Sequence, residues 1–205
     1  MKLQKGRIHM PALVAAVVGP IQVILGFNLA QLFWPEFDPI RRTISDLAAD
    51  DSPVQILMTS FFYFGATLSF VVAIWARSFA LPGRIVIALA GLATYGLAFF
   101  TTPSQDGHSD AHRIFAVISF VLSSAWPLFA MRVDKRYPAI IRPLGAILGT
   151  LGMTAISLVF LASWTDPQAT MTGVWERVIA VGQVWYLAAV IWVCWAAERK
   201  ADKRL

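Results

Sequence analysis

Residues 8–33 read IHMPALVAAVVGPIQVILGFNLAQLF and contain no Asp, Glu, Lys or Arg. A helix needs about 20 mainly apolar residues to cross the hydrocarbon core of a bilayer. The run follows Lys2, Lys5 and Arg7, and a basic start is also typical of a secretory signal. This run is too long for a signal, however, and no small-x-small cleavage motif closes it. It therefore predicts a retained membrane-spanning helix.

The rest of the chain continues in the same way. Of its 205 residues 58% are hydrophobic and 14% charged, whereas a soluble domain has about 45–50% and about 25%. Apolar runs of spanning length predict six helices, at residues 8–33, 54–76, 85–101, 113–131, 140–164 and 174–197. We therefore predict an all-α fold, a single domain over residues 1–205 that forms an integral membrane bundle of six transmembrane helices.

Charged residues are sorted between the predicted loops. If the N-terminus is cytoplasmic, 13 of the 17 Lys and Arg residues lie on that side and 9 of the 12 Asp and Glu residues on the other. Basic residues in short loops accumulate on the cytoplasmic side. We therefore expect a multi-pass protein of the cell membrane with both termini cytoplasmic. The basic side can meet anionic lipid headgroups, so membrane lipids are the expected partners and nucleic acid is not.

One outer segment, residues 106–112, carries four potential metal ligands: Asp106, His108, Asp110 and His112. Imidazole and carboxylate groups can hold zinc, but this spacing matches no strong zinc signature. The favoured interpretation is a polar loop whose Asp110 caps the fourth helix. A polar site that uses His112 with a carboxylate, and a bound metal, are the alternatives. We predict no other cofactor.

The longest outer loop contains Arg-Arg-Thr-Ile-Ser-Asp-Leu at residues 41–47. Ile40, Ile44 and Leu47 recur at helical spacing, which predicts a short amphipathic helix lying in the membrane interface. Arg41 and Arg42 could bind a lipid phosphate or an acidic partner. Pairing with acidic residues of the same loop is the favoured alternative.

Glu176 and Arg177 begin the sixth predicted helix. A glutamate in a first helical turn is stabilised by the helix dipole, which accounts for half of the pair. We expect Arg177 to form an ion pair with an acid of another loop, such as Asp46 or Asp106. A ligand-holding or catalytic arginine is the alternative.

The spans themselves carry no charged residue or histidine near their centres, which disfavours ion-coupled transport. Neutral polar side chains such as Gln22 and Gln183 lie at depth, where they can bond between helices or line a cavity. Gly145 and Gly149, followed by Gly152, form a small-residue face on the fifth predicted helix, where another helix can approach closely. That face serves either inside the bundle, which we favour, or in a homo-oligomer.

Three elements together resemble a known family: Ser45-Asp46-Leu47 after the first span, His112 at the start of the fourth, and Glu176-Arg177 at the start of the sixth. They resemble an uncharacterised prokaryotic family of six-span membrane proteins, a domain of unknown function, which is distantly similar to the DRAM-like membrane proteins of eukaryotes. The resemblance implies a six-helix bundle with both ends inside and a polar cluster at the outer face. It implies no reaction.

We therefore expect a structural bundle, or one that binds a lipid or small ligand at an outward-facing cluster. The ligand-binding candidates are Arg41, Arg42, Ser45, Asp46, His112, Glu176 and Arg177. One alternative is an intramembrane hydrolase or transferase at the outer leaflet, with His112 as base or ligand and Asp46, Asp106 or Asp110 assisting. Another is a passive transporter or flippase. A shared site requires that Asp46, His112 and Glu176 converge to within about 10 Å.

Overall fold

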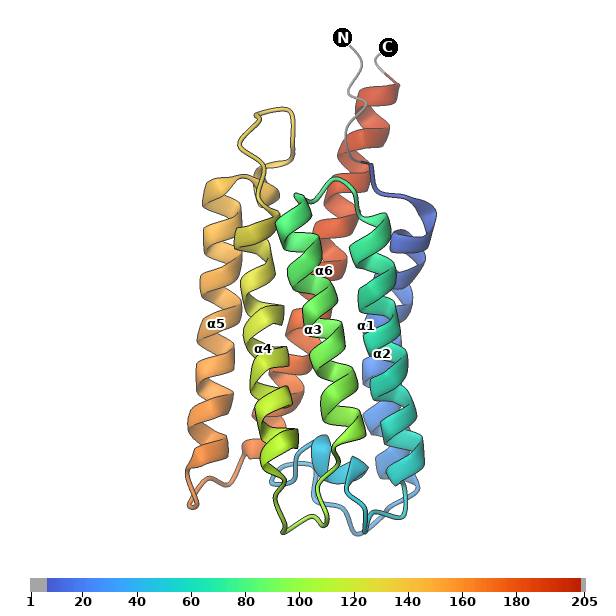
Figure 1. The fold of residues 1–205 in the computed structure, drawn as a ribbon, viewed down its shortest axis with the longest axis vertical. Helices are drawn as coiled ribbons and strands as arrows, with labels where there is room; N and C mark the ends of the chain where they lie inside the picture. The colour runs from blue at the N-terminus through green and yellow to red at the C-terminus, as the bar shows by residue number, and fades with distance from the viewer. Residues whose placement is uncertain (1–6, 204–205) are drawn as a thin grey trace.

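The structure is a computed structural model and describes residues 7–203 (Figure 1). Its six long helices are α1 (Met10–Leu32), α2 (Gln55–Trp75), α3 (Leu81–Phe99), α4 (Asp110–Ala130), α5 (Pro143–Thr165) and α6 (Thr172–Asp202). Two 3-10 turns, η1 (Ser45–Ala48) and η2 (Ala139–Ile141), lie in loops. The described part of the chain has no strand, only one isolated bridge between Ile8 and Ala76. All six helices are long and apolar enough to cross a membrane, which confirms the predicted all-α fold.

Helix ends differ from the predicted spans by a few residues, for chemical reasons. α3 begins at Leu81, because Pro82 is well suited to a first helical turn. α5 begins at Pro143, three residues later than predicted, because η2 occupies the preceding residues. α4 already begins at Asp110, and α6 continues to Asp202. Hydropathy misses these charged turns because a helix continues beyond the apolar core.

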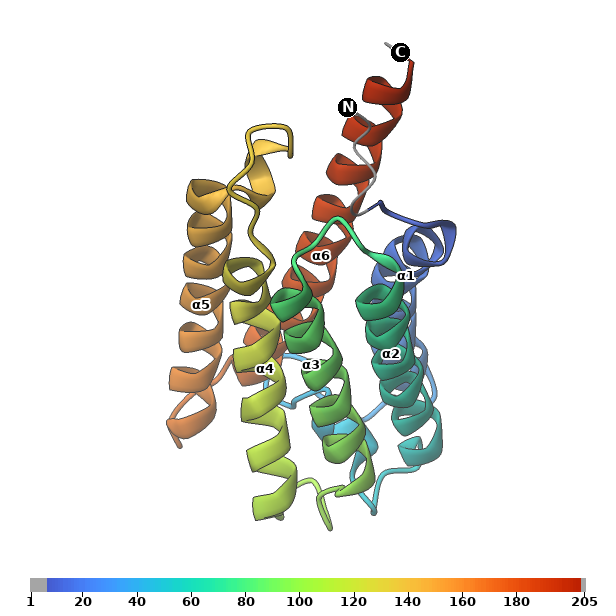
Figure 2. The ribbon, with the colours of Figure 1, turned by 45° about the horizontal axis from the view of Figure 1, so that its top comes forward.

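The helices form a closed ring in chain order. Each helix packs against the next, and α6 returns to pack against α1 (Figures 1 and 2). α5 is the helix least buried by its neighbours. Its Gly149 faces the Tyr186 hydroxyl of α6, and its Gly145 faces the backbone of Ala139, while Gly152 meets nothing within 4 Å. The predicted contact of the small-residue face with another helix of the bundle is therefore formed at Gly149 alone, since Gly145 meets the preceding turn η2.

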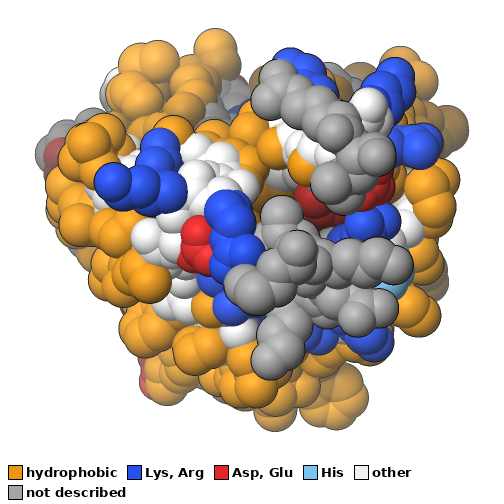
Figure 3. All heavy atoms as spheres, turned by 90° about the horizontal axis from the view of Figure 1, so that it is seen from above, with side chains coloured by type: hydrophobic (Ala, Val, Ile, Leu, Met, Phe, Trp, Pro, Cys, Tyr) orange, Lys and Arg blue, Asp and Glu red, His pale blue; other side chains and the backbone are white. Residues whose placement is uncertain are grey.

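The two ends of the bundle differ in charge. The first and last described residues and the α2–α3 and α4–α5 loops lie at one end, which we call the terminal end (Figure 1). Seen from there, Lys and Arg side chains stand among apolar ones (Figure 3). The other three loops lie at the opposite end, which we call the acidic end. These loops carry Glu36, Asp38, Asp46, Asp50, Asp51, Asp106 and Asp166, and Asp110 begins α4 there.

Two arginines at the terminal end bind backbone carbonyls, one at the end of α2 and one in the α2–α3 loop. The Arg84 guanidinium donates to the Ala73 carbonyl (2.5 Å) and the Ile74 carbonyl (2.9 Å), which lie in the last turn of α2. Arg132 donates to the carbonyls of Ser78 (3.0 Å) and Phe79 (2.9 Å) in the α2–α3 loop. The last carbonyls of a helix have no partner within it. These two arginines therefore serve the fold directly.

Candidate functional site

The loop between α1 and α2 closes the acidic end of the ring. Its residues 43–49, which we call the plug, bury Ile44 and Leu47 against side chains of α1 and α2 such as Phe27 and Met58. The predicted amphipathic helix in the interface is wrong, because only η1 is helical and just Ile40 of the three apolar residues is exposed. Positions i and i+3 share a face in a 3-10 turn as well as in an α-helix. The spacing of Ile44 and Leu47 is therefore compatible with an α-helix and with the 3-10 turn that is observed.

Glu176 of α6 holds the plug from inside the bundle. Its side chain is only 5% exposed. The carboxylate accepts a short hydrogen bond from the Ile44 backbone N–H and a second, at 3.3 Å, from the Ser45 hydroxyl. A buried carboxylate is stable only when its oxygens accept such bonds. Glu176 is thus a latch between α6 and the plug. Because α6 begins at Thr172, Glu176 lies beyond the first turn, and the expected stabilisation of a first-turn acid by the helix dipole does not apply.

Arg177 holds the same loop through its carbonyls. One guanidinium nitrogen donates to the Arg42 carbonyl (3.0 Å) and the Gly173 carbonyl (2.8 Å). The guanidinium carbon lies 5.4 Å from the centre of the Phe27 ring and 5.9 Å from that of Phe37. The expected ion pair with an acid of another loop is not formed among the described residues. A Cβ on Gly173 would also collide with the Arg42 carbonyl oxygen, so the backbones touch here.

The two adjacent arginines have separate partners. Arg42 forms an ion pair with Asp106 (2.8 Å) and donates to the Gln105 carbonyl (2.9 Å), which joins the α1–α2 loop to the α3–α4 loop. Arg41 lies 3.9 Å from Asp38 of its own loop, and both are largely exposed. The favoured pairing within the loop is therefore found for Arg41 alone. Arg42 instead ties two loops together.

Asp46 lies within the plug and caps its turn. Its carboxylate accepts from the Thr43 N–H (2.8 Å), and its own N–H donates to the Thr43 hydroxyl (3.1 Å). Burial raises the pKa of Asp46 above its ordinary value, although the Thr43 hydrogen bonds and the nearby Arg42 charge act in the opposite direction. Asp46 follows Ser45, whose hydroxyl donates to the Glu176 carboxylate, so these two acids are joined through the plug. Within residues 7–203 no hydrogen bond or ion pair joins His112 to either acid. The convergence of all three that a shared site requires stays a prediction.

His112 lies at the start of α4 with only 3% of its surface exposed. Its Nδ1 is 2.9 Å from the Leu97 carbonyl oxygen and 3.0 Å from that of Phe100. Because carbonyl oxygens only accept, Nδ1 carries the hydrogen. Its Nε2 is buried and has no hydrogen-bond partner within residues 7–203. His112 therefore fastens the end of α3 and keeps one unused nitrogen.

The other predicted metal ligands do not converge on His112. Asp106 is in the ion pair described above, and His108 lies 3.6 Å from Asp110 with both side chains exposed. Ser109, and not Asp110 as predicted, caps α4 by accepting from the His112 N–H. Residues 7–203 contain no group of three or more His, Cys, Asp or Glu side chains placed to hold a metal ion. This geometry gives metal binding by the segment no support.

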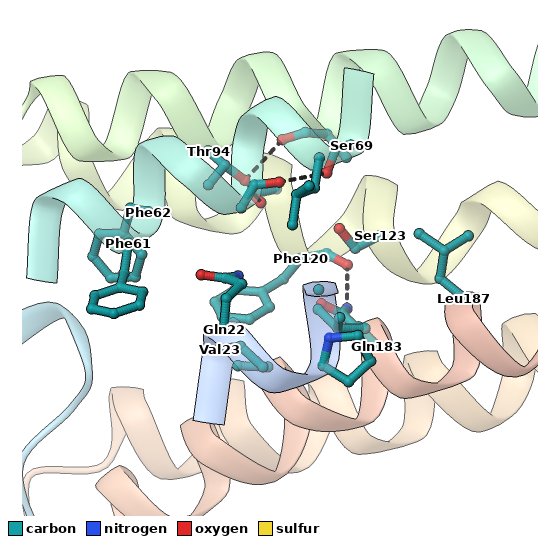
Figure 4. A pocket seen from close by; sticks show the side chains of 18 of the residues that line it. Gln22, Val23, Phe61, Phe62, Ser69, Thr94, Phe120, Ser123, Gln183 and Leu187 are labelled. Atoms are coloured by element: carbon teal, nitrogen blue, oxygen red, sulfur yellow. Dashed lines mark hydrogen bonds between the residues drawn. The ribbon is translucent and has the colours of Figure 1, made fainter. Parts of the chain in front are cut away.

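Beneath the plug lies a central cavity of about 190 Å³ (Figure 4). Its walls come from α1, α2, α3, α4 and α6, and Ser45 and Glu176 border it. Gln183 donates to the Phe120 carbonyl (3.0 Å) and the Ser124 hydroxyl (3.0 Å). The Gln22 side chain lies in the cavity, and its Oε1 is buried with no donor among the described residues. An apolar cavity of about 150 Å³ is enough for a benzene-sized molecule.

Two prolines add acceptors to the cavity wall. Pro20 in α1 and Pro127 in α4 lack a backbone N–H, so the carbonyls four residues earlier have no helical donor. Those carbonyls belong to Ala16 and Ser123, and both residues line the cavity. The structure therefore places both of these residues at one site.

Residues 17–193 match a family described as Protein of unknown function (DUF998). The chain belongs to this family. The matched region runs from α1 to α6 and includes the plug, the latch and most of the cavity wall. No curated protein and no solved structure matches this DUF998 chain. The similarity to DRAM-like proteins stays a prediction.

One functional arrangement of the DUF998 chain was missed from its sequence. Glu198 of α6 accepts from the Ile8 N–H (3.0 Å) and, in a short bond, from the buried Ser78 hydroxyl. At the acidic end Glu176 likewise accepts from one backbone N–H and one serine hydroxyl. The two glutamates are 22 residues apart (198 minus 176), about 33 Å along a helix. The sequence held a signal for this contact, because Glu198 is one of only a few acidic residues on the predicted basic side.

Proposed function

We propose that this DUF998 chain binds a small, mainly apolar molecule that carries a hydrogen-bond donor in the central cavity. The unpaired Oε1 of Gln22 is the observation that carries the proposal. An unsatisfied buried acceptor costs about 1–3 kcal/mol. A hydroxyl or amine of a ligand would remove that cost, while its apolar part would fill the surrounding wall. On this proposal the protein recognises a compound that dissolves in the membrane.

The cavity also limits the size of the ligand. A volume of about 190 Å³ is slightly larger than the roughly 150 Å³ that accommodates one aromatic ring. We therefore expect one ring, or a short branched chain, to be enclosed. Glu176 and Ser45 border the cavity next to the plug, so release of the latch would open a route for the ligand from the acidic end.

Matched fluorinated probes test this proposal. We would measure ¹⁹F NMR binding of 4-fluorobenzyl alcohol and 1-ethyl-4-fluorobenzene to the full chain in lipid nanodiscs. The probes have the same number of heavy atoms, and only the first can donate a hydrogen bond. We expect the alcohol to bind about fivefold more tightly, which corresponds to one hydrogen bond of about 1 kcal/mol. Gln22→Leu should abolish that difference.

Two further variants separate binding in the cavity from partitioning into lipid. Ser123→Phe should fill the cavity, because Ser123 lines it, and should abolish binding of both probes. Ile118→Phe is the matched control and should leave binding of both probes unchanged, because Ile118 is exposed on the same helix and does not line the cavity. Binding that survives Ser123→Phe, or an equal affinity of both probes in the wild type, would refute the proposal.

We further propose that the chain lies in the cell membrane with both termini in the cytoplasm. The basic residues of the terminal end support this orientation. In a Cys194→Ser background, Glu36→Cys at the acidic end should react with a membrane-impermeant maleimide added to intact cells. Lys135→Cys at the terminal end should react only after the cells are opened. The reverse pattern would invert the orientation.

The geometry gives less support to a hydrolase or a transporter. Glu176 and Asp46 use their carboxylates to hold the plug, and His112 donates to backbone carbonyls. Transport would require a continuous polar path from the cavity to the basic residues of the terminal end. Neither Arg84 nor Arg142 lines the cavity, so the cavity does not reach these two residues. These observations favour binding over catalysis or passage.

A further inference from the structure

A second hollow lies between α4 and α5, away from the plug. It has a volume of about 170 Å³. Among its lining residues Val117, Val121, Leu158 and Leu161 are between 37% and 58% exposed. It is therefore a groove on the outer surface of two helices that are apolar enough to span the membrane. We call it the α4–α5 groove.

Small side chains create the groove, and its two serine hydroxyls are paired, while Thr154 adds a further hydroxyl to the lining. Ser124, Ala125 and Ser157 line it, and the two serine hydroxyls bond to each other at 2.9 Å. Two aromatic rings continue the wall toward the acidic end: Phe160 lies 5.8 Å from Trp164 between ring centres, with the ring planes 15° apart. The groove is thus an apolar channel for a flexible chain.

A cation stands where the groove reaches the acidic end. The Arg113 guanidinium carbon lies 5.0 Å above the centre of the Trp164 ring. Arg113 is exposed and forms no ion pair within the described part of the chain. Arg113 and Ala125 are 12 residues apart (125 minus 113), about 18 Å along α4. Half of the hydrocarbon core is about 15 Å thick.

We propose that the α4–α5 groove binds an anionic phospholipid, with one acyl chain along the groove and the phosphate on Arg113. The separation of Arg113 from Ala125 along α4 fits one acyl chain within a single leaflet, and the guanidinium, which forms no ion pair among the described residues, fits the phosphate. Phe120 lines both the groove and the central cavity and so separates them. The lipid site therefore does not depend on the proposed cavity ligand.

Native mass spectrometry of the full chain in detergent tests the proposal. The probes are palmitoyl-oleoyl phosphatidylglycerol and palmitoyl-oleoyl phosphatidylcholine. We expect one molecule of the anionic lipid to bind about fivefold more tightly, the effect of one arginine near a lipid surface. Arg113→Gln should abolish this preference. Arg41→Gln is the control and should retain it, because Arg41 is also exposed but lies in the α1–α2 loop and does not line the α4–α5 groove.

A second pair of variants tests the groove itself. Ala125→Phe should fill it and lower the affinity for both lipids, whereas Ala155→Phe should change neither, because Ala155 is exposed outside the groove. Equal melting temperatures of the two variants would exclude misfolding. Equal binding of the two lipids by the wild type would overturn the proposal. A dimer that Ala125→Phe dissociates would do so too, since the occupant would then be a second copy.

Discussion

The latch at Glu176 allows a quantitative prediction for the variant Glu176→Ala. The change removes both acceptors of the plug and leaves the Ile44 N–H buried without a partner. An orphaned buried donor costs about 2 kcal/mol, and the lost bond from Ser45 adds about 1 kcal/mol. We expect the free energy of opening the plug to fall by about 3 kcal/mol. The bundle itself should persist, because its apolar core is separate from the latch.

Hydrogen–deuterium exchange of the protein in nanodiscs measures this opening directly. Exchange of a protected amide follows the free energy of local opening. A loss of 3 kcal/mol corresponds to exchange that is faster by about a hundredfold. We expect that acceleration at Ile44 and at the following amides of the plug. Amides in the middle of α3 should exchange at the wild-type rate.

Two further variants complete the test. Glu176→Gln should restore most of the protection, because its carbonyl oxygen can accept from the Ile44 N–H while its amide donates to Ser45. Glu36→Ala is the matched control, because it removes an exposed acid from the same end of the bundle. Exchange at Ile44 that stays within threefold of the wild-type rate in Glu176→Ala would refute the role of the latch.

Further predictions concern pH and close backbone contacts. Because burial raises the pKa of Asp46, its ionisation destabilises the fold at neutral pH, and wild-type stability recovers as the pH falls through the raised pKa. Asp46→Asn keeps a hydrogen-bond acceptor without the charge, so its stability should not change with the titration of residue 46. The melting temperature of the variant minus that of the wild type should therefore decrease from pH 7.5 to pH 4. A difference that stays constant with pH would contradict a raised pKa of Asp46. Gly173→Ala should force the plug away from α6 and lower the melting temperature, at a cost of about 1–3 kcal/mol. Gly149→Ala should be similarly destabilising because its Cβ would collide with the Tyr186 hydroxyl, whereas Gly152→Ala meets open space and should be neutral or slightly stabilising. Equal melting temperatures for the last two would argue against the α5–α6 contact.

The helices could be predicted because lipid imposes a simple rule on sequence. A spanning helix must be apolar over about 20 residues, and Ile8–Phe33 satisfies that rule by composition alone. The ends were less predictable, because Asp110 and Asp202 are helical although they are charged. At helix ends, backbone hydrogen bonding and capping decide the structure, and hydropathy does not record either.

The sequence could predict at which end of the bundle the candidate site residues lie, but not which contacts they make. The sequence grouped Asp46, His112 and Glu176 at one end of the bundle, and the structure joins Glu176 to the plug that contains Asp46, while His112 binds the end of α3. The sequence could not reveal that Arg177 binds carbonyls, because backbone acceptors leave no trace in residue types. The central cavity was also beyond prediction. Its volume depends on how five helices pack around Gln22, and no local pattern encodes a space left unfilled.

The two glutamates of α6 have a consequence for how the protein is made. They fasten the segments that flank α1, at Ile8 and at Ile44, to the last helix of the ring. During synthesis α1 is inserted first and α6 last, so α1 must remain in the bilayer with both flanks unfastened until translation is nearly complete. A chain that stopped before Glu198 would keep the Glu176 latch and lack the acceptor of the Ile8 N–H and the Ser78 hydroxyl. Closure of the ring is therefore a late event in the synthesis of the chain, and the terminal end is fastened last.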